Sequence, residues 1–322
     1  MSGRPASMTY AQAACLALQE AMRDDPNVVA LGEDLGRGGI FGQYRGLPQE
    51  FGPARVIDTP ISEATIMGAA VGMALAGLRP VVEMRVVDFA LCAMDELVNQ
   101  AAKNRFMFGG QGRVPLVARM PIGLWSASAA QHSQSLEAWF AHIPGLAVVT
   151  PATPADNYGL LKAALASGDP VVYMEHKELW GSEGEVEPGA AVPLGKARIA
   201  QSGTDLTIVT WSRSVHDCMA AAAQLAGKAI SVELVDLRTI WPWDREGVLA
   251  SCAKTGRLLV VHEAVQVAGF GAEIAATVAE ELGVKVARLG APRIPAGYAQ
   301  PLEDESRVSA AKIAAAAKKL LG

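Results

Sequence analysis

Short apolar runs alternate with longer, alanine-rich stretches along the first half of the chain. The apolar runs have the length and the β-branched residues of strands, at residues 27–32, 81–87, 114–120, 146–149 and 171–175. The stretches between them have the length and composition of helices. Alternation of this kind is typical of a parallel sheet covered by helices on both faces.

A segment rich in Gly, Pro and Glu, from Gly181 to Lys196, interrupts this alternation. It has neither helical nor strand periodicity, and its composition indicates a connection. Beyond it we expect strands at 206–210, 231–237 and 257–263 and helices at 215–225, 271–282 and 309–321. The pattern therefore predicts two α/β domains, residues 1–185 and 197–322, joined by a linker at 186–196.

The composition agrees with a globular protein of two domains. The chain has 322 residues, about twice the ~150 residues of one average domain. Its 51% of hydrophobic residues excludes a disordered chain. The net charge of −5, with no run of Lys or Arg, argues against nucleic acid or an anionic membrane as a partner. Apolar runs are shorter than the ~20 residues of a membrane span, so we expect a soluble protein.

The four cysteines, Cys15, Cys92, Cys218 and Cys252, are too far apart in sequence for a CxxC zinc site. A chain of this length does not need disulfide bonds to hold its core. Reduced thiols are typical of the cytosol, and we therefore expect a cytoplasmic protein.

Charged residues occur inside an apolar stretch, Arg79 to Phe89, that we interpret as a strand. The period of two puts Glu83 and Arg85 on one face of this strand. Charges on a buried strand need partners. Either the two residues pair with each other, or they line a polar cavity.

The segment from Asp58 to Thr65 has the features of a helix start. Pro60 suits a first turn, and Glu63 places a carboxylate near the positive end of the helix dipole. That position favours acidic residues without any functional reason. The helix that follows contains Gly68 and Gly72, and an interior glycine costs about 1 kcal/mol relative to alanine. We expect another element to pack closely against it.

His132 lies in a stretch of hydroxyl and amide side chains, from Ala129 to Ser135. A histidine between Gln and Ser is most often a satisfied polar residue. Among the five histidines, however, its setting is the most loop-like, which suits contact with a substrate.

The glycines of the stretch from Gly269 to Ile274 resemble a dinucleotide-binding loop only in part. The last position holds Ile274 where the fingerprint requires Gly or Ala. An ordinary turn from strand to helix is favoured.

Several segments in order carry a common pattern: GEDLGR, IDTPISEATIMGAAVGMALAGLRPVVEM, AAQHSQSLEAWFAHIPGLAVVTPATPAD, DPVVYMEH, TIVTWSRSVHD, VELVDLRTIWPWD, and VVHEA followed by GFGAEI. From about Met8 to Leu321 the chain resembles the β subunit of thiamin-diphosphate-dependent 2-oxo acid dehydrogenases, the E1 component of the pyruvate, branched-chain and acetoin enzymes. The resemblance implies a pyrimidine-binding domain followed by a transketolase C-terminal-like domain, both with parallel α/β sheets.

The resemblance also implies roles for individual residues. Glu63 would bond the ring nitrogen of the cofactor's aminopyrimidine and promote loss of the thiazolium C2 proton. Phe89 would pack on the aminopyrimidine, and Arg85 would lie in the segment lining the cofactor. His132 would face the substrate. The implied reaction is decarboxylation of a 2-oxo acid, or cleavage of acetoin, with transfer of the acyl group to a lipoyl carrier.

Thiamin enzymes hold the diphosphate through Mg²⁺ on a GDG segment, and this chain has no GDG. The resemblance therefore implies an α subunit that carries the Mg²⁺ site, in an α₂β₂ tetramer, with a lipoyl E2 acyltransferase as a further partner. It also implies a monovalent cation, such as K⁺, on backbone carbonyls at Leu116, Ala164, Leu165, Ser167 and Asp169.

Arg85 departs from the family pattern, which has Met or Gln there. It either reads an additional anionic group of the substrate or is neutralised by Glu83 or by a carboxylate of the partner chain. Two other functions stay open: a two-chain transketolase-like carboligase without redox chemistry, and a non-catalytic stabilising subunit.

Overall fold

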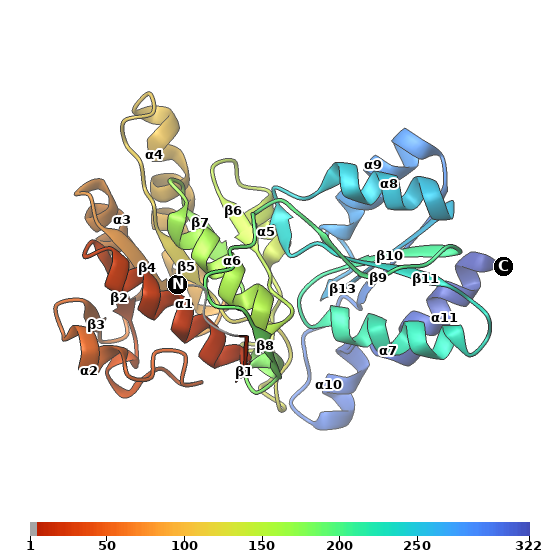
Figure 1. Ribbon diagram of the computed structural model, residues 1–322, viewed down its shortest axis with the longest axis horizontal. Helices are drawn as coiled ribbons and strands as arrows, with labels where there is room; N and C mark the ends of the chain where they lie inside the picture. Colours follow the sequence, from red (N-terminus) through yellow and green to blue (C-terminus); the bar gives the residue numbers. More distant parts are fainter. Residues whose placement is uncertain (1–4) are drawn as a thin grey trace. The chain divides into compact units, whose positions relative to one another are not determined.

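The computed structural model describes residues 5–322, and its contacts divide the chain into two compact units (Figure 1). The first unit comprises residues up to 122 together with residues 139–194. The second unit comprises residues 123–138 together with residues 195–322. The short segment 123–138, which contains His132, is therefore packed with the C-terminal half of the chain. The domain limits at residues 185 and 197 stay a prediction.

The first unit is built on a parallel sheet, as predicted. Six strands of this unit lie in the order β6-β7-β5-β4-β2-β3, each parallel to its neighbours. They are β2 (Val28–Gly32), β3 (Val56–Asp58), β4 (Arg79–Glu83), β5 (Val117–Arg119), β6 (Ala147–Val149) and β7 (Val171–Tyr173). All five strands predicted in this half are present with changed ends, and β3 is an additional strand that the apolar pattern did not indicate.

Helices and helical turns cover this sheet. They are α1 (Tyr10–Asp24), η1 (Leu35–Arg37), α2 (Leu47–Phe51), α3 (Glu63–Leu75), η2 (Phe89–Ala93), η3 (Asp95–Ala101), α4 (Ala102–Met107), α6 (Pro154–Ala166) and η4 (Lys177–Leu179), and α5 (Glu137–Ala141) begins at the end of the segment 123–138. α1 packs against α6, and its buried Leu18 and Met22 join the main core of the unit. A capping box starts α1: Thr9 accepts the N–H of Gln12, whose side chain accepts the N–H of Thr9.

Two short strands form a separate antiparallel pair, β1 (Ala6–Thr9) with β8 (Glu183–Val186). The prediction that the Gly, Pro and Glu-rich segment has no strand was therefore wrong at its beginning. β1 and β8 are far apart in sequence. The extended conformation of β8 therefore depends on hydrogen bonds with the backbone of β1, and it does not require alternating apolar and polar residues in its own sequence.

The second unit has a five-stranded sheet in the order β14-β13-β10-β11-β9, with only β9 antiparallel to its neighbour. Its strands are β9 (Arg198–Gln201), β10 (Leu206–Thr210), β11 (Val232–Asp236), β13 (Arg257–Val265) and β14 (Lys285–Ala291), and β12 (Thr239–Trp241) follows β11. Its helices are α7 (Ser214–Ala226), α8 (Arg245–Thr255), α9 (Gly271–Leu282), α10 (Gln300–Ser306) and α11 (Ala310–Leu321). α8 and α9 lie on one face of the sheet, and α7 and α11 lie on the other (Figure 1).

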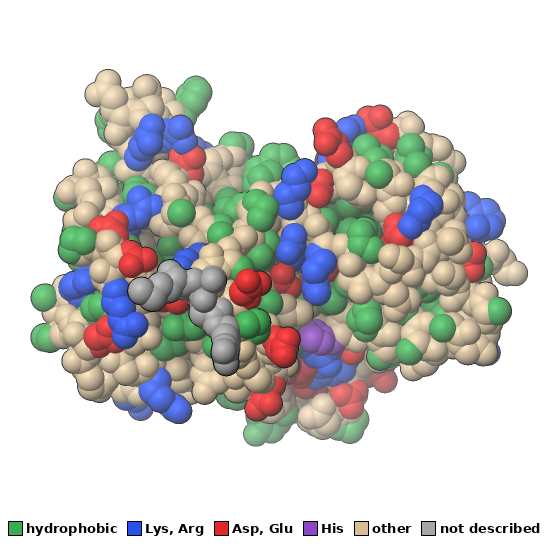
Figure 2. Space-filling view, in the orientation of Figure 1, with side chains coloured by type: hydrophobic (Ala, Val, Ile, Leu, Met, Phe, Trp, Pro, Cys, Tyr) green, Lys and Arg blue, Asp and Glu red, His purple; other side chains and the backbone are tan. Residues whose placement is uncertain are grey.

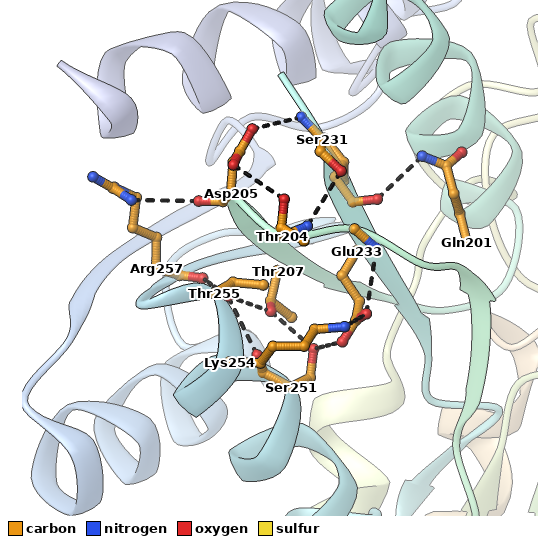
Figure 3. Close-up of polar contacts among 12 residues, drawn as sticks. Gln201, Thr204, Asp205, Thr207, Ser231, Glu233, Ser251, Lys254, Thr255 and Arg257 are labelled. Atoms are coloured by element: carbon orange, nitrogen blue, oxygen red, sulfur yellow. Dashed lines mark hydrogen bonds and ion pairs between the residues drawn. The ribbon is translucent and has the colours of Figure 1, made fainter. Parts of the chain in front are cut away.

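A buried cluster of polar side chains connects α8 to this sheet through hydrogen bonds (Figure 3). The carboxylate of Glu233 on β11 accepts hydrogen bonds from the hydroxyl of Ser251 at 2.7 Å and from Lys254. The hydroxyl of Thr207 on β10 lies 2.8 Å from that of Ser251 and 2.7 Å from that of Thr255. We interpret this cluster as structural, because its two charged side chains, Glu233 and Lys254, form an ion pair with each other.

Basic and acidic side chains are interspersed on the visible face of the molecule instead of forming a large basic patch (Figure 2). Within residues 5–322, none of the helices combines the length and the apolar character needed to cross a membrane.

Candidate functional site

The carboxyl ends of parallel strands meet at one edge of the first unit's sheet. From β2 the chain moves to β3 on one side, and it later returns to β4 on the other side of β2. In open α/β sheets, ligands bind at such a reversal, outside the carboxyl ends of the strands. The residues that follow β2, β3 and β4 are therefore the candidates for a site.

Gly32, the last residue of β2, allows the strand ends to come together. Its φ is +149°, and a Cβ atom there would lie 2.6 Å from the carbonyl oxygen of Glu83, the last residue of β4. A side chain would therefore separate β2 from β4 at the edge. The next two residues, Glu33 and Asp34, are placed directly beside the end of β4.

Arg85 pairs with Asp34 and not with Glu83. The Arg85 Nη1 lies 2.5 Å from the Asp34 Oδ2, and Arg37 also donates to Asp34. Glu83 instead accepts a hydrogen bond from the hydroxyl of Tyr44 at 2.9 Å. The predicted strand over 79–89 was wrong beyond Glu83, because β4 ends there and Arg85 has a φ of +37°. This break in the extended backbone removes Arg85 from the face that holds Glu83.

Two carboxyl groups, Glu33 and Glu63, interact at this edge. Glu63 is the first residue of α3 and is half-buried, while Glu33 is almost fully buried. Burial raises the pKa of Glu33, the negative charge of Glu63 raises it further, and the positive charge of Arg85 opposes this change. A carboxyl group that retains its proton more readily, close to another glutamate, is an arrangement suited to proton exchange with a weak base.

Phe89 lies in the segment that follows β4, as the first residue of η2, and its side chain is half-buried. Because η2 packs against α3, the aromatic ring belongs to the same region as the helix that begins with Glu63. The structure thus brings Glu63, Arg85 and Phe89 to one edge of the first unit.

His132 lies in the second unit, on an exposed turn that the hydrogen bond from its N–H to the carbonyl of Ala129, 3.3 Å, closes. The loop that leads to it contains three non-glycine residues with positive φ: Ser126, Ala127 and Ala129, at +46°, +57° and +63°. A positive φ is uncommon in residues other than glycine and asparagine, and residues with this backbone angle often cluster at functional sites. His132 and Glu63 belong to different units of the chain.

The five carbonyl oxygens predicted to hold a monovalent cation all accept hydrogen bonds. Arg79 donates to the carbonyls of Leu165 and Ser167 at 2.6 and 2.7 Å. The carbonyls of Leu116 and Ala164 accept backbone N–H groups, and that of Asp169 accepts the hydroxyl of Ser167. A guanidinium therefore already places a positive charge on two of the five oxygens.

Both parts of the chain match known families. Residues 6–182 match the family described as transketolase, pyrimidine binding domain, and residues 195–313 match transketolase, C-terminal domain. The β subunit of the acetoin:2,6-dichlorophenolindophenol oxidoreductase of Cupriavidus necator is 44% identical over 321 residues, which is 95% of this chain and 95% of that protein. The chain belongs to this transketolase-like family of dehydrogenase β subunits.

Other members of this transketolase-like family align over similar lengths. The 2-oxoisovalerate dehydrogenase subunit β of Bacillus subtilis is 40% identical over 97% of this chain and 98% of its own. The pyruvate dehydrogenase E1 component subunit β-1 of Arabidopsis thaliana is 43% identical over 92% of this chain and 84% of its own. A solved split-gene transketolase, described as an inactive β4 tetramer, has the same fold, with a TM-score of 0.81, 22% identity and 98% coverage of both chains.

Membership of this thiamin-diphosphate-dependent family confirms the predicted resemblance and fold class. Sequence reasoning nevertheless missed Glu33 and Asp34 as site residues. A signal was present, since an acidic pair directly follows the wholly buried strand β2.

Proposed function

We propose that this chain is the β subunit of a thiamin-diphosphate-dependent dehydrogenase. The enzyme would decarboxylate a 2-oxo acid, or cleave acetoin, and pass the acyl group to a lipoyl carrier. The observation that carries the proposal is that residues 6–182 match a pyrimidine-binding family and that Glu63 begins α3 within this match. Relatives named as such subunits align over nearly the whole chain. A cytoplasmic location stays a prediction.

Half of a thiamin diphosphate site fits the residues of this chain. An aminopyrimidine ring needs a carboxyl group at its ring nitrogen and a flat apolar surface against its face. The half-buried carboxyl of Glu63 and the half-buried ring of Phe89 are chemically suited to these two tasks. When bound, the cofactor supplies an electron sink for cleavage of the bond next to a carbonyl.

Three side chains would perform the protein's part of the reaction. Glu63 would hold and release a proton at a carboxyl oxygen, as a general acid and base. Glu33, with its raised pKa, would limit the negative charge next to Glu63. His132 would donate a ring N–H to the carboxylate or the carbonyl oxygen of the substrate.

The proposal includes an α subunit that supplies the Mg²⁺ and diphosphate half of the site, in an α₂β₂ tetramer. Two exposed features of the first unit support a partner. Phe106, Met107 and Phe108 at the end of α4 are 91%, 69% and 55% exposed. On α3 an added Cβ at Gly72 would meet nothing within 4 Å, so the close packing expected at this helix is not supplied by the chain itself at that position. Exposed apolar surface of this kind is typical of an interface. A lipoyl E2 acyltransferase is a further proposed partner.

We also propose a K⁺ ion on the carbonyls of Leu116, Ala164, Leu165, Ser167 and Asp169. A carbonyl oxygen has two lone pairs, so each can bind a cation in addition to its hydrogen bond. Thermal unfolding of the chain in potassium chloride and in choline chloride tests this, with a higher midpoint expected in potassium. Equal midpoints at equal ionic strength would exclude the site.

The proposed function is tested by reconstitution. The chain alone should bind thiamin diphosphate weakly and turn over no substrate, whereas co-expression with an α subunit should produce 2-oxo acid- or acetoin-dependent reduction of 2,6-dichlorophenolindophenol. Ketol transfer between sugars without dye reduction would favour the carboligase instead. Full turnover by the isolated chain would exclude the two-subunit proposal.

The role of His132 is tested in the assembled enzyme. His132→Ala should reduce kcat/KM for the substrate much more than it weakens binding of thiamin diphosphate. His216→Ala is a matched control, since His216 lies in α7 of the same unit and outside this loop. Loss of cofactor with unchanged substrate kinetics at saturation would contradict the assignment.

A further inference from the structure

The loop that leads to His132 is held by two carboxylates from distant parts of the second unit. Glu303 of α10 accepts the backbone N–H of Ala127 at 2.7 Å. Glu263 of β13 accepts the backbone N–H of Leu124, also at 2.7 Å. The two bonds fix the backbone on the amino-terminal side of the turn from Ala129 to His132.

Glu303 is buried in a manner that is unusual for a carboxylate. Its residue exposure is 0%, and its second oxygen accepts a hydrogen bond from Arg307 at 3.1 Å. A buried charge requires partners, and here one of them is the backbone of a loop instead of a second ion. Hydrogen bonds to a charged acceptor are roughly twice as strong as those between neutral groups.

Packing alone does not immobilise this loop. Leu124, Ala130 and Ser133 are part of the lining of a cavity of about 420 Å³ in the second unit, so one side of the segment faces free volume. The backbone must also hold positive φ at Ser126, Ala127 and Ala129. Without the bond to Glu303, the loop could relax toward ordinary backbone angles by moving into that volume.

We infer that Glu303 is a positioning residue for His132. Its carboxylate, held in place by Arg307, keeps Ala127 in the conformation that presents the turn bearing the histidine. The inference rests on the proposed function in one respect, namely that His132 contacts the substrate.

Glu233 provides a matched control for this role. It too is a buried carboxylate of the second unit that accepts a backbone N–H, from Gly203 at 3.4 Å, and bonds to a cationic side chain. Its hydrogen bonds go to Gly203, Ser251 and Lys254, and these residues lie outside the loop (Figure 3). A purely structural loss should therefore affect Glu233→Gln and Glu303→Gln alike.

The test is a double-mutant cycle in the assembled enzyme. Glu303→Gln should lower kcat/KM for the substrate about 10- to 100-fold, the scale expected for a misplaced catalytic group, with unchanged affinity for thiamin diphosphate. Glu233→Gln should lower the unfolding midpoint without this loss. In a His132→Ala background, Glu303→Gln should have no further effect on kcat/KM. Additive losses in the cycle would overturn the inference.

A second measurement is independent of activity. In the ¹H–¹⁵N spectrum of the full chain, the ring signals of His132 should shift in Glu303→Gln and stay unchanged in Glu233→Gln. Unchanged signals in both variants would refute the positioning role. An assembled wild-type enzyme without dehydrogenase activity would instead refute the proposed function, while the spectra would still decide the positioning role.

Discussion

Arg85 of the segment after β4 and Asp34 of the segment after β2 form an ion pair at 2.5 Å across the ends of these two strands. The sequence did not show which carboxylate neutralises Arg85. In the structure this carboxylate is Asp34 of the same chain and not Glu83. The ion pair also places a positive charge close to Glu33, whose pKa that charge lowers. The effect of Arg85 is therefore expected on the carboxyl groups of the site.

Replacing Arg85 with Met should raise the pKa of Glu33, because the opposing positive charge is lost. Asp34→Asn should lower it, because the negative charge of Asp34 raises this pKa in the native chain. The pKa is measurable from the pH dependence of the Glu33 carboxyl ¹³C signal. Since Arg85 already has a partner, the ratios of kcat/KM for pyruvate, a branched 2-oxo acid and a dicarboxylic 2-oxo acid should change little. A large change in these ratios would show that Arg85 reads the substrate.

Replacing Glu63 with Gln should reduce turnover of the assembled enzyme about 10²- to 10⁴-fold, the usual loss when a proton-transfer group is removed. The fold should remain intact, because glutamine has the size of the half-buried Glu63 side chain and the N-cap of α3, Ser62, makes no side-chain capping bond that the change could disturb. Removal of its charge should also lower the pKa of Glu33.

Glu50→Gln is the matched control for Glu63, because Glu50 is an exposed carboxylate of α2 that pairs with Arg23. It should retain full turnover. Wild-type exchange of the cofactor's C2 proton in Glu63→Gln would mean that the assignment of Glu63 is incorrect.

The order of strands and helices could be predicted from the sequence because each apolar run carries its own signal. β3 (Val56–Asp58) was missed because it contains only two apolar residues, too few to stand out as an apolar run, and only pairing with β2 makes it a strand. β8 was missed because its partner, β1, lies at the other end of the first unit's sequence.

Candidate site residues could be predicted from the sequence only where they belong to a recognisable motif. Glu63 and Phe89 come from such motifs. The contribution of Glu33 and Asp34 depends on the approach of β2 to β4 at Gly32, which no local pattern encodes. The partner of Arg85 could not be predicted, because a single residue with positive φ ended the expected alternation.

The glycines that resembled a nucleotide loop have a packing role, which Gly271→Ala should reveal. A Cβ at Gly271 would lie 2.8 Å from Nε2 of His262, and one at Gly269 would lie 2.7 Å from its Cε1. The ring of His262 is buried and stacks on Trp211 with centroids 5.1 Å apart, so it has no room to move. Overpacking of this kind costs about 1–3 kcal/mol.

Chemical denaturation measures this loss of unfolding free energy. Gly227→Ala is the control, since Gly227 at the end of α7 has ordinary backbone angles and an added Cβ would meet only the carbonyl of Gln224 at 3.5 Å. It should be neutral or slightly stabilising. Equal stability of Gly271→Ala and wild type would contradict the packing role.

Glu83 is buried in the first unit. Burial raises its pKa from 4.5 to about 7, although the nearby Arg119 and the hydrogen bond from Tyr44 oppose the change. The unfolded chain releases this proton near pH 4.5, whereas the folded chain retains it to about pH 7. The stabilising contribution is therefore complete below pH 4.5 and is lost as the pH rises through 7, by about 3 kcal/mol in total.

Glu83→Gln has no such proton and still offers Tyr44 an acceptor. Unfolding in urea from pH 4.5 to 8 measures the free energy of unfolding of the variant and of wild type at each pH. The variant's value minus the wild-type value should increase steadily with pH, by about 3 kcal/mol over this range. In Tyr44→Phe, loss of the hydrogen bond should raise the pKa of Glu83 further. The loss of unfolding free energy with rising pH should therefore continue to a higher pH than in wild type. A difference between Glu83→Gln and wild type that is constant with pH would mean that Glu83 titrates in the folded chain as it does in the unfolded one.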